Sequence, residues 1–401
     1  MRKNLIAVFL ISLLILPVST LWSADFGLIM DQNGIIRGSS SNNQPGYIGS
    51  LIPRVASFIG ERGFFSASLG LNFEYSNDTF GFIPELLRTE FIWQFDNSDL
   101  VFGRMFYSDP LSLIASGLFD GAKLSFITSR GIFSMGAFYT GFLYKNRVNV
   151  FSSSVDSGNT ELDYNDFFNT YFAPRHLLLS LDWEHPSLGG SFFGGGISIL
   201  GQFDLNGDNY HSQYISGKFS FPLNAFLFDI GGSVNFIQDN SDFGIALAFG
   251  FGIYWTLPTA LPSRLSFLSL YSSGTFHNGP MSAFQPFTVN PIGFVFDAPF
   301  SGISKISLDY IVRVYRTFSI SLGSSFFIRN DLGTYDGYPL EGSGSTGYFL
   351  GNEFITQLYW SPFSDISLNL GGGLFLPFMG DAAPSAPISW KLGINLILSL
   401  Y

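Results

Sequence analysis

An all-β fold, a single antiparallel transmembrane β-barrel, is the class that the amino-acid sequence predicts from its composition, its residue periodicity and its connection lengths. Of 401 residues, 18% are aromatic and 12% are charged. Soluble domains carry roughly twice that charged fraction, about 25%. With 45 glycines, the chain is also too rich in glycine for a helical bundle. Much of its surface is therefore expected to face something other than water.

The composition also excludes several function classes. The chain has no cysteine, so a disulfide scaffold, a thiolate metal site and a cysteine nucleophile are ruled out. Its formal net charge is −11, whereas proteins that bind nucleic acid present basic surfaces to the phosphates. Nucleic acid is therefore not an expected partner.

Residues 1–24 have the organisation of a secretory signal peptide. Arg2 and Lys3 form a positive start, residues 5–16 form an apolar core, and a proline ends that core. An uncleaved anchor helix is the alternative, but a membrane span needs about 20 apolar residues. We therefore expect export, with a barrel over residues 25–401.

Past this segment, apolar residues alternate with polar or small ones at a period of two. In residues 303–316, for example, Ile306 and Leu308 alternate with Lys305 and Asp309. Successive side chains of a β-strand point to opposite faces, so this is strand periodicity.

Residues 243–263 carry no charge, which raises the alternative of a membrane-spanning helix. Large residues such as Phe249 and Phe251 hold the odd positions, and glycine or alanine holds each even position from 244 to 252. A helix would scatter the small residues around its circumference, whereas a strand gathers them on one face. A strand is therefore favoured here too.

The chemistry of the two strand faces predicts the medium that each one meets. The apolar faces are rich in Phe, Leu and Ile, and the opposite faces often carry Gly, Ser and Ala rather than Lys and Glu. A soluble sandwich would turn a charged face to water. A barrel with an apolar outside fits better, and its closure pairs every backbone group that lies in lipid.

Eighteen strands are predicted, with 14 or 16 as alternatives because the first strand is weakly marked. Connections after even-numbered strands are brief, and those after odd-numbered strands are usually longer. Bacterial barrels have short periplasmic turns and long extracellular loops, so both termini are expected in the periplasm. An extra strand at 292–297 would break this parity, so that segment is assigned to a loop. The predicted strands are 26–31, 47–59, 64–75, 83–95, 100–107, 117–128, 132–145, 176–184, 191–203, 210–221, 224–237, 243–256, 264–276, 303–315, 317–329, 348–360, 366–376 and 388–400.

Charged residues in phase with the polar faces are the candidate lining of a water-filled interior. Both signs are present, so they could orient hydrated solutes in a narrow zone. Ion pairs that stiffen the wall are the alternative. The predicted pore-lining residues are Arg88, Glu90, Arg104, Asp120, Asp309, Arg313, Glu353 and Lys391, with Gln94, Asp182, Glu184 and Lys305 in the same phase. Arg88, Arg104 and Asp120 fall on consecutive strands and are expected to form one cluster.

The loop of residues 146–175 is the candidate constriction. It carries four acids, Asp156, Glu161, Asp163 and Asp166, followed by several aromatic residues. Small residues on the predicted wall leave room for this loop inside the barrel, where its carboxylates would favour cations. An exposed acidic loop outside the barrel is the alternative.

The C-terminal segment resembles the assembly signal of outer-membrane barrels. The pattern runs from Lys391 as Lys-Leu-Gly-Ile-Asn-Leu-Ile-Leu, with its key positions at Gly393, Leu396, Leu398 and Tyr401. Tyr401 lies one step out of phase with the apolar face. The resemblance implies that the barrel-assembly machinery is a partner.

A second segment resembles the alginate-export and related carbohydrate-selective porins. It consists of Val-Phe-Gly-Arg at 101–104 and Gly-Leu-Phe-Asp-Gly-Ala-Lys-Leu at 117–124. The resemblance implies an 18-stranded channel whose interior arginines bind anionic sugars, and it would carry over to Arg104 and Asp120. The rest of the basic set is sparse, which argues against polyanion export.

No catalytic, metal or cofactor site is expected. The four histidines are His176, His185, His211 and His277, and none is spaced for a pairing with a serine nucleophile. His185 lies at a turn, and the Asp-rich segment at 204–208 lacks the glutamate of a calcium loop.

These features predict an outer-membrane porin for passive diffusion of small hydrophilic solutes, with outer-membrane lipid and small polar solutes as partners. A surface scaffold or adhesin barrel is one alternative, and a hydrophobic-solute transporter is another. An enzyme is not expected.

Overall fold

The structure is a computed structural model that describes residues 24–39, 43–76, 79–145, 162–163, 165–187, 194–207, 210–240, 242–275, 282–332 and 347–400. Most of the predicted signal peptide, Asp156, Glu161 and the closing Tyr401 lie outside the described residues.

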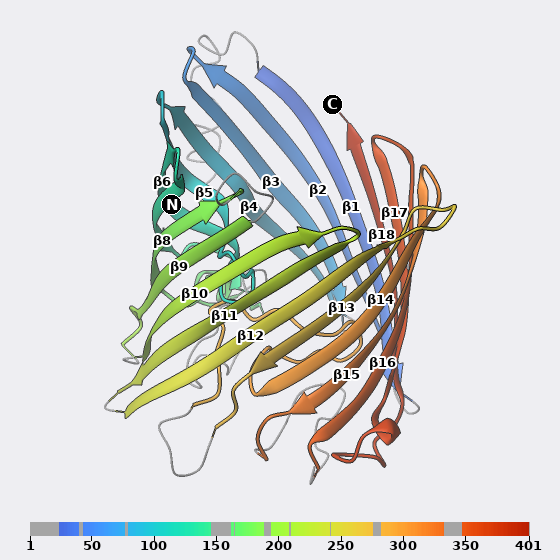
Figure 1. Ribbon diagram of the computed structural model, residues 1–401. Helices are drawn as coiled ribbons and strands as arrows, with labels where there is room; N and C mark the ends of the chain where they lie inside the picture. Colours follow the sequence, from blue (N-terminus) through green and yellow to red (C-terminus); the bar gives the residue numbers. More distant parts are fainter. Residues whose placement is uncertain are drawn as a thin grey trace.

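Eighteen antiparallel strands form one barrel, as predicted (Figure 1). Each strand pairs with its neighbours in sequence, and β1 pairs with β18, which closes the sheet. The strands are β1 (Ala24–Ser39), β2 (Asn43–Ile59), β3 (Gly63–Ser76), β4 (Thr79–Gln94), β5 (Ser98–Ser108), β6 (Ser116–Thr128), β7 (Gly131–Tyr139), β8 (His176–His185), β9 (Gly194–Asp204), β10 (Tyr210–Leu223), β11 (Phe226–Asp239), β12 (Asp242–Leu257), β13 (Ser263–Ser272), β14 (Ile303–Tyr315), β15 (Phe318–Arg329), β16 (Phe349–Phe363), β17 (Ile366–Leu376) and β18 (Ser389–Leu400).

Connection lengths follow the predicted parity at most positions. Every connection after an even-numbered strand is short, and several are turns of two or three residues. The long connections join β7 to β8, β13 to β14, β15 to β16 and β17 to β18, at the opposite end of the barrel (Figure 1). Residues 292–297 belong to the β13–β14 connection, as expected.

The prediction of a short first strand followed by a loop at 32–46 is wrong. β1 continues to Ser39, and β2 begins at Asn43. Polar and glycine residues such as Asn33 and Gly34 had suggested a loop. In the barrel, however, Asn33 faces inward and lies opposite Asn395 of β18, so a polar residue there interrupts no apolar face.

The strand predicted over 132–145 also ends earlier, at Tyr139. A turn begins directly afterwards, because the N–H of Leu143 donates to the carbonyl of Thr140 at 2.9 Å. The chain then leaves the sheet and forms the short helix α3 (Phe167–Tyr171) before β8. Among the described residues, no helix is long and apolar enough to cross a bilayer.

Large apolar side chains are exposed on the outer face of the barrel, and many polar side chains are buried in its wall. Phe106 and Leu181 are 60% and 57% exposed on the outer face, whereas Ser198 and Asn235 are fully buried in the wall. This is the distribution of a barrel whose outer surface meets lipid.

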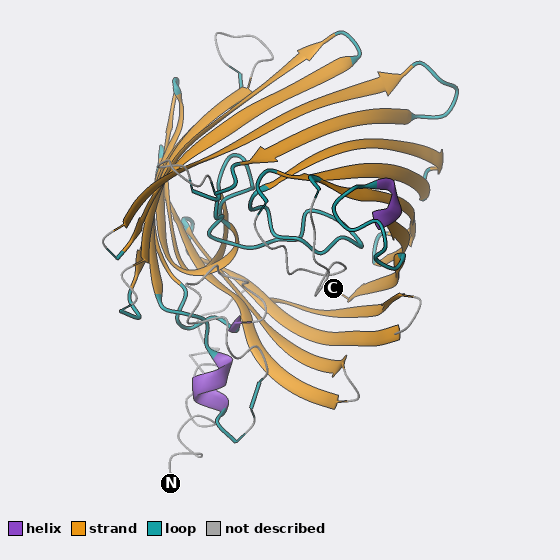
Figure 2. Cartoon of the chain, turned by 90° about the horizontal axis from the view of Figure 1, so that it is seen from below, coloured by secondary structure: helices purple, strands orange, loops and turns teal. Residues whose placement is uncertain are grey.

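The barrel interior is partly filled by its own connections. One apolar cluster combines inward residues of β5 to β12, such as Phe138 and Tyr214, with Phe284 and Phe287 of the β13–β14 connection. A second cluster combines residues of β15 to β17 with Val295 and other residues of the same connection. Residues 282–302, called the inner loop below, therefore cross the interior inside the ring of strands (Figure 2).

Candidate functional site: the barrel interior and its inner loop

Glu353 of β16 is the main anchor of the inner loop. Its carboxylate accepts hydrogen bonds from the backbone N–H groups of Phe294 at 3.0 Å, Val295 at 2.6 Å and Phe296 at 2.7 Å. Hydrogen bonds to an ionised acceptor are roughly twice as strong as neutral ones. Glu353 is completely buried, so its charge holds the loop and is not presented to water.

Two lysines hold the carbonyls of the same turn. Lys305 of β14 donates from Nζ to the carbonyl of Ile292 at 2.6 Å, and Lys391 of β18 donates to that of Phe294 at 2.9 Å. The Lys391 ammonium also lies 4.9 Å from the centre of the Phe294 ring. The structure thus brings Glu353, Lys305 and Lys391 together around one segment of the inner loop.

The first part of the inner loop is held at the opposite wall. The hydroxyl of Tyr214 on β10 donates to the carbonyl of Gln285 at 2.7 Å. Thr288 accepts a hydrogen bond from the N–H of Ser116 at the start of β6, at 2.9 Å. The inner loop is therefore fixed at both sides of the interior.

The β5–β6 connection supports the inner loop and is organised by Asp109. This carboxylate accepts the backbone N–H groups of Leu111 at 2.9 Å, Ile114 at 3.0 Å and Ala115 at 2.9 Å. Burial raises the pKa of the Asp109 carboxyl, and the three backbone hydrogen bonds lower it by less.

Arg104 and Asp120 form a bidentate ion pair between β5 and β6. Nε and Nη2 of Arg104 each lie 2.8 Å from a carboxylate oxygen of Asp120. Arg104 also donates to the carbonyls of Phe142, at 2.9 Å, and Leu86. These bonds tie β5 to the start of the β7–β8 connection and to β4.

The lumen assignment predicted for Arg104 and Asp120 is not supported by the strand register. Arg104 lies two residues from Phe102 and two from Phe106, which are 46% and 60% exposed on the outer face. The covering groups leave Arg104 only 6% exposed. The predicted cluster with Arg88 does not form either, because Arg88 pairs with Glu90 at 2.7 Å instead.

The remaining predicted residues are spread around the wall. Asp309 and Arg313 share the inward phase of Lys305 on β14, and Arg313 is exposed. Asp182 of β8 accepts a hydrogen bond from Ser198 at 2.5 Å and is buried. Gln94 and Glu184 are exposed near strand ends.

Of the predicted constriction loop, the structure describes residues 162–163 and 165–175. Asp163 accepts the N–H of Asn165 at 2.8 Å, and Asp166 precedes α3. The hydroxyl of Tyr171 donates to the carbonyl of Pro84 on β4 at 2.8 Å. This segment therefore packs against β4, and its effect on ions stays a prediction.

The β4–β5 junction is a feature that the sequence analysis missed. The two strands pair only between Thr89–Gln94 and Asp99–Arg104, although β4 begins at Thr79. At the point where they separate, Gly103 has a φ of +113°, and a Cβ there would overlap the carbonyl oxygen of Thr89. An isolated glycine in a strand pattern was the available signal.

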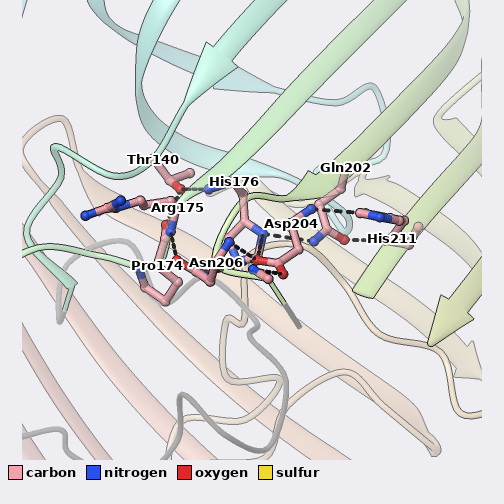
Figure 3. Close-up of polar contacts among 10 residues, drawn as sticks. Thr140, Pro174, Arg175, His176, Gln202, Asp204, Asn206 and His211 are labelled. Carbon is pink, nitrogen blue, oxygen red and sulfur yellow. Dashed lines mark hydrogen bonds and ion pairs between the residues drawn. The ribbon is translucent and has the colours of Figure 1, made fainter. Parts of the chain in front are cut away.

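A buried polar network joins the ends of β8, β9 and β10 (Figure 3). Nδ1 of His176 lies 3.0 Å from Nε2 of Gln202 and 3.9 Å from a carboxylate oxygen of Asp204. Ser212 donates to Gln202 at 2.5 Å rather than to a histidine, so this is not a nucleophile and base pair. The His176 ring packs edge-on against Phe287, which links the network to the inner loop.

Among the described residues, no group of three or more His, Cys, Asp or Glu side chains is placed to hold a metal ion.

A niche of about 250 Å³ remains between the inner loop and the wall formed by β1, β16, β17 and β18. Lys391, Phe294 and several carboxamide side chains line it. The inner loop and this niche are the main features of the interior that the described residues define.

No known protein family matches the chain, and no curated protein matches it. Several solved structures from Pseudomonas aeruginosa share its fold. OpdQ has a TM-score of 0.63 at 10% identity over 94% of this chain and 99% of its own. OccK5 (OpdH) has a TM-score of 0.62 at 13% identity over 95% and 99%. OccK2 (OpdF) in complex with glucuronate has a TM-score of 0.61 at 13% identity over 95% and 98%.

The fold class is therefore a large closed barrel with an occupied interior. At 10–13% identity, the likeness establishes the fold alone. The resemblance to alginate-export porins rests on two short segments within 101–124 and stays a prediction.

Proposed function

We propose that the protein is an outer-membrane porin through which small hydrophilic solutes diffuse passively. The observation that carries this proposal is the inner loop, which Glu353, Lys305 and Lys391 hold across the interior of the barrel. A barrel of this size without an inserted segment leaves a wide aqueous passage. A segment fixed at both walls would narrow such a passage and so restrict it to small solutes.

The outer surface of the barrel supports a location in the outer membrane. Exposed Phe, Leu and Ile side chains occur around the barrel, and lipid is the medium that such a surface fits. The names of the similar Pseudomonas structures include an outer membrane protein, opdK, and a complex with glucuronate, which is a small polar solute. The predicted signal peptide supplies the export step.

Assembly would use the C-terminal strand. Leu396 and Leu398 of β18 lie in the outward phase of Leu392 and Ile394, and Gly393 lies in the inward phase. We propose that this pattern, with Tyr401, is recognised by the barrel-assembly machinery before the strand joins β1.

Purified protein in a planar lipid bilayer tests the channel. We expect stepwise increases in conductance that scale with the amount of inserted protein. A surface scaffold would give none, although its folded barrel would still show heat-modifiable mobility on a gel. Absence of steps from protein that passes this folding control would refute the porin proposal.

A further inference from the structure

We propose that the niche beneath the inner loop binds a neutral, hydroxyl-rich solute, such as a monosaccharide, through a row of asparagine amides. The inference rests on the proposed channel function and names the class of solute that the channel selects.

The row is set by the strand register. Asn33 of β1 lies directly opposite Asn395 of β18, and Asn395 lies directly opposite Asn369 of β17. Cross-strand neighbours on one face have Cβ atoms about 4.5–5.5 Å apart. The three carboxamides therefore form a continuous strip across three strands, and all three line the niche.

The neighbouring row provides a fourth amide and the surface on which Phe294 packs. Gln357 of β16 lies opposite Gly371, and both residues line the niche. The ring of Phe294 from the inner loop packs directly on Gly371, where a Cβ would come within 3.0 Å of it, so this ring closes the niche on the Gly371 side. A niche of about 250 Å³ is below the usual range for drug-sized ligands, roughly 300–1,000 Å³, and suits a single sugar ring.

Carboxamides match hydroxyl groups because both donate and accept hydrogen bonds. Nδ2 of Asn395 donates to Asp31 at 2.7 Å, which orients this amide. Oδ1 of Asn369 is buried and accepts no hydrogen bond from the described residues. Buried polar atoms are nearly always hydrogen-bonded. After a small rotation of the Asn369 amide, its Oδ1 would accept a hydrogen bond from a hydroxyl of the bound solute.

The charges around the niche argue for a neutral solute rather than an acidic one. Lys391 already donates to the carbonyl of Phe294 and lies over its ring. Arg37 of β1 lies in the same cross-strand row as Lys391, and its Nη1 is 3.7 Å from a carboxylate oxygen of Asp297. Asp31, which is bonded to Asn395, would repel a carboxylate placed on the amide row. Positive and negative groups are therefore balanced, and the strip between them is uncharged.

Single-channel recording with two sugars tests the inference. Glucose is the neutral probe, and glucuronate is the same ring with a carboxylate. We expect glucose to interrupt the current in a concentration-dependent way and more strongly than glucuronate. The double variant Asn33→Leu/Asn369→Leu keeps the side-chain size but removes the amides, and should weaken glucose block roughly three- to tenfold.

Asn235→Leu is the matched control. It makes the same exchange on the inner face of β11, which is remote from β18 in the strand order, and should leave glucose block unchanged. Should the double variant not insert, Asn33→Leu alone takes its place, and undiminished block in that channel would overturn the role of the row.

The outcomes separate the two proposals. Normal conductance without interruption by glucose would overturn the niche and leave the porin intact. Stronger block by glucuronate than by glucose would overturn the neutral class. Absence of conductance from folded wild-type protein would overturn both the channel and its niche.

Discussion

Glu353 shows how a single buried acid can hold a loop across the interior of a barrel. Its two oxygens receive three backbone N–H groups from consecutive residues of the inner loop. In Glu353→Gln, one oxygen becomes an NH₂ group and leaves at least one of those donors unsatisfied, at a cost of about 1–3 kcal/mol. We expect a more mobile inner loop, seen as larger and noisier single-channel currents.

Glu61→Gln is the control for this variant, because Glu61 is exposed in the turn between β2 and β3. Its conductance should match the wild type. Currents of wild-type size and noise from Glu353→Gln would contradict the anchoring role.

Asp109 gives the fold a pH dependence with a definite sign. Burial raises its pKa in the folded protein above the unfolded value. Stability from this group is therefore fully present below the ordinary carboxyl pKa and is lost as pH rises through the raised pKa. From roughly pH 4 upward, the melting temperature should fall more steeply in the wild type than in Asp109→Asn.

Melting curves in detergent at a series of pH values measure this difference. Asp109→Ala removes all three acceptors for the loop N–H groups and should be less stable than the wild type throughout the series. Parallel profiles for the wild type and Asp109→Asn would show that Asp109 does not titrate with folding.

At the scale of the element, the β4–β5 junction depends on one glycine. Gly103 has a positive φ, and a Cβ there would overlap the backbone of Thr89. Gly103→Ala should destabilise the barrel by about 1–3 kcal/mol, a usual range for strained backbone positions. Gly60→Ala separates the cost of the positive φ from the cost of the overlap with Thr89. Gly60 also has a positive φ, but no atom lies within 4 Å of a Cβ built there.

Denaturant titration of both variants in detergent measures the effect. A loss of stability in Gly103→Ala no larger than in Gly60→Ala would show that the overlap with Thr89 is relieved without cost.

The strands were predictable because each one separates two media. Alternation of Ile306 and Leu308 with Lys305 and Asp309 is a local property, and it identified β14 without knowledge of the fold. The extent of β1 was not predictable in this way. Its polar residues are compatible with a strand only once β18 and β2 lie beside them.

At the scale of the whole molecule, the even number of strands followed from the parity of the connections, but the content of the interior did not. Phe284 and Phe287 lie in a connection that sequence analysis treats as outside the sheet. Their burial depends on Phe119, Phe138 and Tyr214, which are distant in sequence. The loop carboxylates were sought at 146–175, whereas the anchoring acid proved to be Glu353 on a strand.

The acids of the β7–β8 connection carry a prediction about the whole molecule. Asp163 and Asp166 lie in a segment that packs against β4, and Asp156 and Glu161 precede them in sequence. If these acids border the solute path, changing all four to their amides should reduce the preference for cations. Reversal potentials in a salt gradient measure that preference, and an unchanged value would exclude these acids from the path.

The pairing of β1 with β18 gives the amide strip an unusual origin. Asn33 comes from the first strand and Asn395 from the last, so the Asn33–Asn395 pair of the strip forms only when the two ends of the polypeptide are joined. A barrel in which β1 and β18 are not yet paired lacks the complete amide strip. Sugar binding would therefore show that this last strand pairing has formed.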